Sequence, residues 1–302
     1  MGTIIIYGVI ALTIAGIILS LVLYLVAQKF KVVEDPRIDQ VAEKLPGANC
    51  GGCGFAGCRS LAEAIVKSGN LDGKFCPVGG SAVMGQVADI MGLQASESEP
   101  MIAVVRCNGG KCNTHKKVEY DGAMDCMVAN QNFAGEGGCS FGCLGLGNCV
   151  KACKFDALSI NEETGLPEVN ENKCVACGAC VKACPRGVIE LRKKGLKNRR
   201  VFVSCINKEK GAVAKKNCDV ACIGCGKCEK ACAFGAITIE NNLSYIDFNK
   251  CKLCRKCVEA CPTGAIHAVN FPIAKPKAET LQTQENTNDN TQQERSIENE
   301  NI

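Results

Sequence analysis

Cysteine is the residue type whose spacing suggests chemistry in this chain of 302 residues, 25 of which are cysteines. Two runs share the spacing C-x2-C-x2-C-x3-C followed by proline: Cys174, Cys177, Cys180 and Cys184, and Cys251, Cys254, Cys257 and Cys261. In bacterial ferredoxins three thiolates of such a run bind one [4Fe–4S] cluster, and the fourth binds the other cluster of a pair. The two runs therefore predict iron–sulfur clusters, whose chemistry is electron transfer.

A further cysteine run precedes each of these. Cys222, Cys225, Cys228 and Cys232 keep the spacing, with Ala233 in place of proline. Cys139, Cys143, Cys149 and Cys153, followed by Lys154, are more widely spaced, and we interpret them as a modified run because glycines make the longer loop easy. The crossing rule then predicts four ligand sets: Cys139, Cys143, Cys149 and Cys184; Cys153, Cys174, Cys177 and Cys180; Cys222, Cys225, Cys228 and Cys261; and Cys232, Cys251, Cys254 and Cys257.

A different cysteine group lies nearer the N-terminus. Cys50, Cys53, Cys58 and Cys76 follow the spacing x2, x4 and x17 within GANCGGCGFAGC and the segment after it. This is not ferredoxin spacing, but four cysteines with glycines between the first three suit a cubane cluster. A structural zinc ion is the alternative. We predict a fifth [4Fe–4S] cluster at this group.

Five cysteines lie outside these sets: Cys107, Cys112, Cys126, Cys205 and Cys218. Cys107, Cys112 and Cys126 are candidates for one further metal site. The alternative is that they pack as small apolar residues, as buried free cysteines often do. The two histidines, His115 and His267, are interpreted as surface or packing residues.

The first 28 residues predict a membrane anchor. Ile4 to Ala27 carries no charge, and as a helix it would span roughly 36 Å, enough to cross a hydrocarbon core of about 30 Å. Basic residues follow this stretch and none precedes it, so the positive-inside rule predicts a single pass through the cell (inner) membrane with the remaining chain cytoplasmic. A secretory signal peptide is the alternative, but the stretch is too long and lacks a basic n-region. In a reducing cytoplasm, cysteines act as metal ligands more often than as disulfides.

The elements that must position these cysteines predict an α+β chain. Residues 81–93 have helical apolar spacing, residues 101–106 resemble a strand, and a short apolar segment closes each cysteine run, so the second half of the chain is an internal repeat. The predicted order is a transmembrane anchor (1–28), a small helical 4Fe-4S domain (29–98), a connecting segment (99–134), a ferredoxin-like domain (135–191), a basic connecting segment (192–216), a second ferredoxin-like domain (217–268) and a disordered tail (269–302).

Motifs for substrate chemistry are absent from the sequence. It has no GxGxxG between a strand and a helix, no P-loop and no nucleophile–base pair, so we predict no catalytic residue. The net charge of +4 is too small to indicate nucleic-acid binding. Residues 192–216 hold ten lysines and arginines against Glu209 alone. This segment is a solvated face, a landing site for an acidic electron carrier, or a contact with anionic lipid.

The order of these pieces resembles the B subunits of Rnf complexes, the ion-translocating ferredoxin:NAD oxidoreductases. The resemblance rests on LPGANCGGCGFAGCRSLAEAIV, CSFGCLGLGNCVKAC and CVACGACVKACP behind an anchor, and it covers residues 1 to about 270. The second ferredoxin half is similar to the extended form found in that family, while Ala233 and Lys154 depart from the usual Cys-Pro.

The resemblance implies a membrane-anchored electron-transfer component of a translocase. It would accept electrons from reduced soluble ferredoxin and pass them along its 4Fe-4S clusters to other membrane and peripheral subunits, coupled to export of sodium ions or protons. One alternative is a self-contained iron–sulfur reductase that acts on another substrate or on a corrinoid protein. Another is a scaffold that zinc ions stabilise and that has no redox role.

Overall fold

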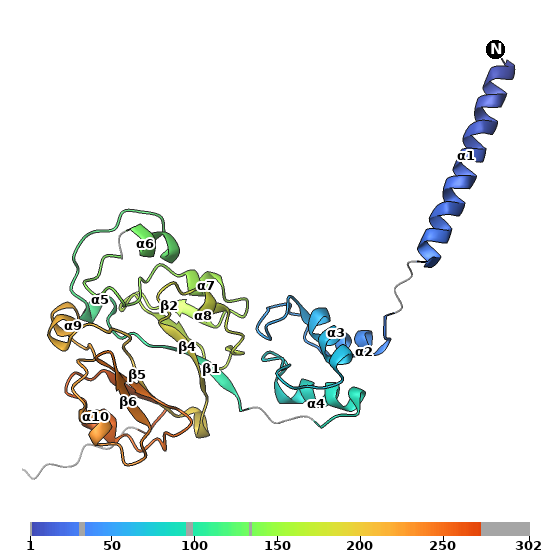
Figure 1. The fold of residues 1–302 in the computed structure, drawn as a ribbon. Coiled ribbons are helices and arrows are strands. Elements are labelled where there is room, and N and C mark those ends of the chain that lie inside the picture. The colour runs from blue at the N-terminus through green and yellow to red at the C-terminus, as the bar shows by residue number, and fades with distance from the viewer. Residues whose placement is uncertain (1, 30–33, 95–98, 133–134, 273–302) are drawn as a thin grey trace, which may run out of the picture. The chain divides into compact units, whose positions relative to one another are not determined.

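The computed structural model describes residues 2–29, 34–94, 99–132 and 135–272 (Figure 1). Its helices are α1 (Gly2–Lys29), α2 (Arg37–Lys44), α3 (Cys58–Ser68), α4 (Gly80–Met91), α5 (Gly110–Asn113), α6 (Cys126–Asn132), α7 (Asn148–Lys151), α8 (Ala179–Ala183), the 3₁₀ helix η1 (Leu196–Asn198), α9 (Gly211–Asn217), α10 (Lys227–Lys230) and α11 (Lys256–Glu259). Its strands are β1 (Met101–Val105), β2 (Leu158–Ile160), β3 (Pro167–Val169), β4 (Ile189–Lys193), β5 (Arg200–Val203), β6 (Ile237–Glu240), β7 (Leu243–Ile246) and β8 (Ile266–Val269).

Helix α1 is apolar around its whole circumference. Its stretch Ile5–Lys29 is long and apolar enough to cross a membrane, and none of the most apolar part is buried against the rest of the chain. A helix that is apolar on all sides and unburied needs another apolar surrounding, which a bilayer supplies. The predicted N-terminal apolar helix is therefore present.

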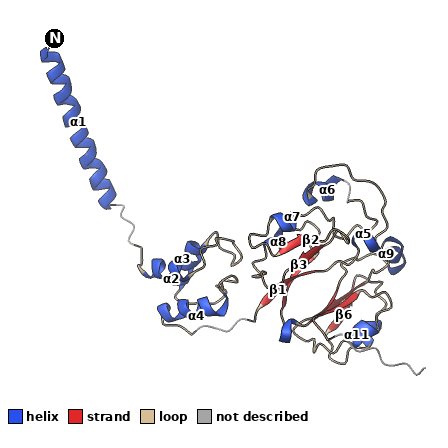
Figure 2. Cartoon of the chain, turned by 180° about the vertical axis from the view of Figure 1, so that it is seen from behind, coloured by secondary structure: helices blue, strands red, loops and turns tan. Residues whose placement is uncertain are grey.

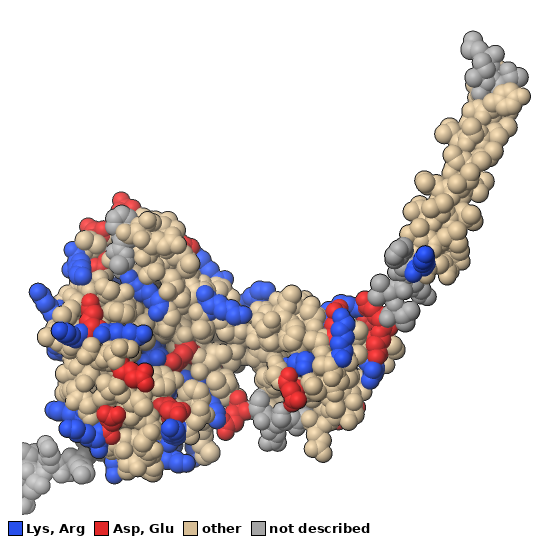
Figure 3. Space-filling model, viewed as in Figure 1, with Lys and Arg blue, Asp and Glu red and all other residues tan. Residues whose placement is uncertain are grey.

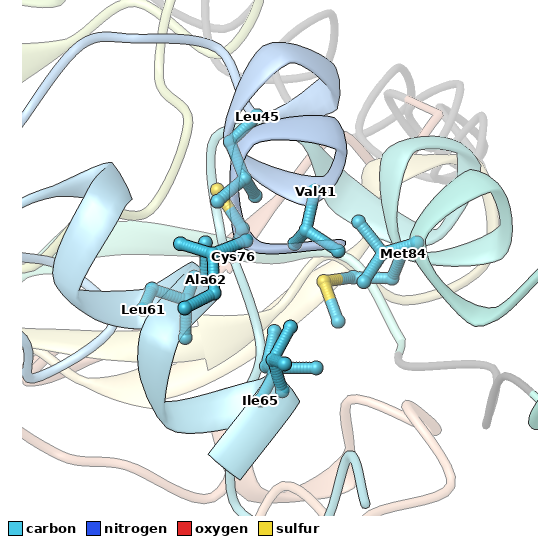
Figure 4. Close-up of a cluster of buried hydrophobic side chains, with 10 residues drawn as sticks. Val41, Leu45, Leu61, Ala62, Ile65, Cys76 and Met84 are labelled. Atoms are coloured by element: carbon cyan, nitrogen blue, oxygen red, sulfur yellow. The ribbon is translucent and has the colours of Figure 1, made fainter. Parts of the chain in front are cut away.

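Helices α2, α3 and α4 enclose a small apolar core of their own (Figure 4). On α3, Leu61 and Ile65 are one turn apart and fully buried, and Val41 of α2 and Met84 of α4 pack against them. Gly69 ends α3 in the left-handed conformation, where glycine carries no steric penalty. This core holds in place the segment that carries the N-terminal cysteine group.

Two similar halves follow, and every strand of the described chain belongs to them (Figure 2). In the first half β1 pairs antiparallel with β4, while β2 and β3 form an inner hairpin. In the second half β5 pairs with β8, and β6 and β7 form the hairpin. The strands β1 and β5 fall in the segments 99–134 and 192–216, so each ferredoxin-like half recruits a strand from the segment before it. The predicted α+β class is confirmed.

Buried arginines from the first half contact the second. Arg106 donates from Nε to the carbonyl oxygen of Val203 at 3.3 Å, and its guanidinium lies 5.0 Å from the ring centre of Tyr245. Arg192 lies 5.2 Å from the same ring and pairs with Glu190. Cation–π contacts of this kind are strongest where water is excluded. The two halves therefore pack as one body.

This packing corrects the expectation that residues 192–216 form one basic surface. Arg192 is 1% exposed and Arg200 is 7% exposed, the latter paired with Glu171. The exposed basic side chains of the segment are Lys197, Lys208, Lys210, Lys215 and Lys216. Composition gives the number of charges but not which of them the fold buries. The predicted disordered tail lies outside the described residues from position 273 onward.

Candidate iron–sulfur sites

The second half gathers its eight run cysteines at two cavities of about 330 Å³ each. One is lined by Cys222, Cys225, Cys228 and Cys261, and the other by Cys232, Cys251, Cys254 and Cys257. Gly226 and Arg255, both in the left-handed conformation, turn the chain sharply into α10 and α11. Each helix then carries its buried third cysteine and delivers the fourth to the other cavity. These are the same groups that the ferredoxin spacing assigned.

The first half brings Cys153, Cys174, Cys177 and Cys180 together in a comparable way. Burial raises the pKa of Cys180 to about 12, and the nearby thiols of Cys174, Cys177, Cys149 and Cys153 add to the increase. Gly178 takes the left-handed turn that starts α8. Cys180 is buried and the other three cysteines are half-buried near it, so the four thiols are neighbours, as the ligands of one cluster must be.

The other site of the first half has a different composition from the predicted one. Its cavity is lined by Cys126, Cys143, Cys149 and Cys184. Cys126 replaces Cys139, which lines a separate cavity. Burial raises the pKa of Cys149 to about 11, and the nearby thiols of Cys126 and Cys184 raise it further. Cys126 is therefore a direct neighbour of Cys149.

Side-chain caps explain how Cys126 reaches this cavity. Asp125 Oδ1 accepts hydrogen bonds from the N–H groups of Met127 (2.7 Å) and Val128 (3.1 Å) at the start of α6. Asn148, at the start of α7, donates from Nδ2 to Asp125 Oδ2 at 3.0 Å and accepts from the N–H of Cys126 at 2.9 Å. The two helix starts are thereby tied together, which places Cys126 beside Cys149.

Three cysteines of the N-terminal group, Cys53, Cys58 and Cys76, lie close together at the start of α3. Asn49 Oδ1 accepts from the N–H of Cys58 at 2.8 Å and so ties the Cys50 loop to the helix. Cys76 is buried, and burial raises its pKa, with Cys58 and Cys53 contributing further. The N–H of Gly79 points at Cys76 Sγ at 3.4 Å. Hydrogen bonds to sulfur of this kind stabilise a thiolate.

The predicted extra site of Cys107, Cys112 and Cys126 does not assemble. Cys112 is exposed, and its thiol donates to the carbonyl oxygen of Glu163 at 3.6 Å. Cys126 belongs to the cavity already described, and Cys107 lines another together with Cys139, Cys205 and Cys218. The sequence contains one signal of this arrangement. Three residues separate Cys139 from Cys143, and three residues separate Cys218 from Cys222. Cys143 therefore corresponds to Cys222, and Cys139 corresponds to Cys218.

The arrangement of thiols bears on the zinc alternative. Within the described ranges, no three Cys, His, Asp or Glu side chains converge closely enough to hold a single metal ion. A zinc site needs its thiolates about 2.3 Å from one ion. The ligands of a cubane cluster instead bind different irons and surround a cavity, as the cysteines of three of the four sites in the ferredoxin halves do.

Three protein families match segments of the chain. The family described as "Putative Fe-S cluster" matches residues 45–78, "4Fe-4S binding domain" matches residues 167–190, and "4Fe-4S dicluster domain" matches residues 221–265. The first covers the N-terminal cysteine group, and the other two lie in the two ferredoxin halves.

Curated relatives resemble the chain over most of its length. It is 44% identical over 237 residues (78% of this chain, 70% of the relative) to the B subunit of the Na(+)-translocating ferredoxin:NAD(+) oxidoreductase complex of Acetobacterium woodii. It is 43% identical over 251 residues (83% and 93%) to the B subunit of the ion-translocating oxidoreductase complex of Methanosarcina acetivorans. The B subunit of the proton-translocating ferredoxin:NAD(+) oxidoreductase complex of Clostridium ljungdahlii is 43% identical over 242 residues (80% and 84%). With such identity over so much of both chains, this protein belongs to the family of B subunits of ion-translocating oxidoreductase (Rnf) complexes.

Proposed function

We propose that this chain is the membrane-anchored electron-transfer component of an ion-translocating ferredoxin:NAD oxidoreductase. The observation that carries the proposal is the gathering of run cysteines into cluster-sized groups in both ferredoxin halves. The names of the curated relatives support the ferredoxin:NAD reaction. The alternative of a self-contained reductase has no such support.

The cysteine groups fit [4Fe–4S] clusters in their donor set. We assign one cluster each to Cys50, Cys53, Cys58 and Cys76; to Cys126, Cys143, Cys149 and Cys184; to Cys153, Cys174, Cys177 and Cys180; to Cys222, Cys225, Cys228 and Cys261; and to Cys232, Cys251, Cys254 and Cys257. When bound, a cluster supplies reversible one-electron transfer.

The protein's own contribution is to place the thiols and to bury several of them, while Cys225 and Cys254 remain exposed. Burial raises the pKa of Cys143 to about 12 and that of Cys257 to about 11. Such thiols stay protonated at neutral pH until iron supplies positive charge, and a coordinating thiol is then deprotonated. Because electrons enter and leave without a bond being made, the chain needs no acid–base group at these sites.

Metal and sulfide analysis tests this function. Anaerobically purified full-length protein should contain iron and acid-labile sulfide in equal amounts, at least about twenty of each per chain. It should show broad visible absorption that bleaches when reduced ferredoxin is added. Zinc in place of iron, or clusters that ferredoxin does not reduce, would contradict the proposal.

We further propose that the cluster-bearing body faces the cytoplasm. The basic residues that follow α1 support this orientation. A C-terminal fusion to a reporter that is active only in the cytoplasm should be active. A fusion to a reporter that is active only outside the cytoplasm should be silent, and the opposite pattern would reverse the assignment.

A further inference from the structure

Four cysteines outside the five assigned sets line one cavity of about 330 Å³. They are Cys107, Cys139, Cys205 and Cys218. The cavity has the same volume as each of the two cluster cavities of the second half. Cys139 and Cys218 are buried, and Cys107 and Cys205 are half-buried. Both size and donor set therefore match the neighbouring sites.

The four cysteines come in two equivalent pairs, one from each half. Cys107 follows the last residue of β1 by two positions, and Cys205 follows the last residue of β5 by two positions. Cys139 and Cys218 each precede the first ligand of their half's run, Cys143 or Cys222, with three residues between. Because β1 and β5 occupy corresponding places in the two halves, the internal repeat itself brings the four thiols to one place.

The hydrogen bonds around these sulfurs repeat in the same way. Cys107 Sγ accepts from the N–H of Cys143 at 3.3 Å and also from that of Gly109. Cys205 Sγ accepts from the N–H groups of Cys222 and Asn207, the residues in the equivalent positions. Each of these two sulfurs therefore has two N–H donors, at equivalent positions of the two halves.

A polar side chain and backbone groups also surround these four sulfurs. Asn207 is 1% exposed and donates from Nδ2 to Cys139 Sγ at 3.5 Å. A Cβ added at Gly109 would overlap the hydroxyl oxygen of Thr114 and would stand 3.5 Å from Cys218 Sγ and 3.7 Å from Cys107 Sγ. A Cβ added at Gly142 would stand 3.5 Å from Cys139 Sγ and 3.8 Å from Cys107 Sγ. Both glycines therefore lie within van der Waals distance of the sulfurs, and their backbone segments line the space around the thiols.

We propose that Cys107, Cys139, Cys205 and Cys218 hold a sixth [4Fe–4S] cluster, shared between the two ferredoxin halves. The proposal rests on the proposed electron-transfer function. In that role the site takes one electron from a reduced cluster of one half and gives one electron to an oxidised cluster of the other, with no atom or proton transferred. Four thiols around one cavity supply the four ligands that a cubane cluster requires.

Iron and sulfide counts on the full-length, anaerobically purified protein test the sixth site. The wild type should contain about 24 irons and 24 sulfides per chain instead of about 20. Cys205→Ala and Cys218→Ala should each lose about four of both, and the double variant should lose no more than either single variant. Cys112→Ser is the matched control, because that thiol is exposed and faces Glu163, and it should keep the wild-type count.

The outcomes separate this proposal from the broader one. A wild-type count near 20 overturns the sixth cluster and leaves the electron-transfer function standing. One equivalent of zinc in the wild type that is lost in Cys205→Ala also overturns the sixth cluster and leaves the electron-transfer function standing. A wild type without iron refutes the electron-transfer function itself. Because the iron and sulfide count of the wild type decides whether the sixth cluster exists, the test does not depend on how well a variant folds.

Discussion

Arg186 brings a half-buried positive charge to the first ferredoxin half. It lines the cavity of Cys126, Cys143, Cys149 and Cys184. Its Nη1 donates to the carbonyl oxygens of Gly142 at 2.7 Å and Cys139 at 3.2 Å, and its Nε donates to Asn130 Oδ1 at 3.0 Å. Burial lowers the pKa of this guanidinium, and the nearby thiols counteract that effect when ionised. Arg186 thus remains charged beside the cluster ligands.

Removing this charge should lower a reduction potential. The Arg186→Gln variant loses a cation that favours the more negative, reduced state of the neighbouring cluster. We expect its midpoint potential to fall by on the order of 60 mV, a tenfold change for a one-electron couple. Redox titration followed by EPR measures the change. Lys182→Gln, on the surface of the same half, should shift it much less, and equal shifts in both variants would argue against a local effect.

Cys126 offers a sharp test of the revised ligand set. If Cys126 and Cys184 hold the same cluster, Cys126→Ala and Cys184→Ala should each lose about four irons, and the double variant should also lose about four. Combining Cys126→Ala with Cys225→Ala should cost about eight irons, because Cys225 lies at another cavity. Full iron content in Cys126→Ala would restore Cys139 as the ligand.

At the scale of elements, the conformation of a cysteine loop depends on close contacts between its backbone and that of a neighbouring element. Gly224, between Cys222 and Cys225, has a φ of +63°, and a Cβ added there would lie 2.7 Å from the carbonyl oxygen of Asn242. Gly235 has a similar φ of +58°, but an added Cβ would meet no atom within 4 Å. Substituting each of the two glycines therefore distinguishes the effect of backbone strain from the effect of steric overlap.

Alanine at these two positions should give different results. Both substitutions place an L-residue in the left-handed region, at a cost of roughly 1–2 kcal/mol. Gly224→Ala also forces the loop away from the hairpin turn at Asn242, so it should lose clusters and lower the thermal midpoint by several degrees more than Gly235→Ala. Iron content and thermal unfolding under anaerobic conditions measure this. Equal losses would mean that strain alone matters.

At the scale of the whole molecule, the two halves form one redox body. Apolar residues on one face of β1, Ile102 and Val104, pack with Phe202 of β5. Arg106 and Arg192 add polar and cation–π contacts to the second half. This packing brings the repeated segments after β1 and β5 to one cavity, which neither half could complete alone.

The surface of this body carries both signs of charge. Lysine and arginine side chains are interspersed with acidic ones on the face that Figure 3 displays. Within residues 192–216 the exposed basic side chains do not include Arg192 and Arg200, which are buried. A charge-reversal test of ferredoxin docking must therefore use exposed positions, since a glutamate at position 192 would be buried in the protein interior.

Reversing Lys208, Lys210 and Lys216 to glutamate should slow electron uptake from an acidic ferredoxin at low salt. Opposite charges mainly raise the association rate, and salt screens them beyond about 10 Å at 0.1 M. We expect a several-fold defect that shrinks as salt rises, measured by stopped-flow reduction at unchanged iron content. Lys116→Glu with Lys117→Glu is the control for exposed lysines elsewhere. A defect that does not depend on salt, or an equal defect in the control, would contradict docking at this segment.

The sequence by itself determined what local spacing controls. Cysteines at x2 spacing share one loop, and the x3 step carries the fourth across to the partner site, so the groups of the second half were predictable from the run alone. The apolar stretch from Ile4 to Ala27 likewise predicted its own helix. Helical apolar spacing predicted a helix at residues 81–93, where α4 (Gly80–Met91) lies, and a short apolar run predicted a strand at 101–106, where β1 (Met101–Val105) lies.

Only the tertiary structure decided where distant segments meet. Cys126 reaches its cavity through caps that tie α6 to α7, and Cys139 is displaced to the cavity shared by the two halves. Composition alone suggests that Arg192 is a surface charge, yet the second half covers it with Tyr245 and Phe248. These outcomes depend on strand pairing and on packing between residues far apart in the chain. The spacing of a single cysteine run does not determine such contacts, because they form only when segments far apart in the chain pack together.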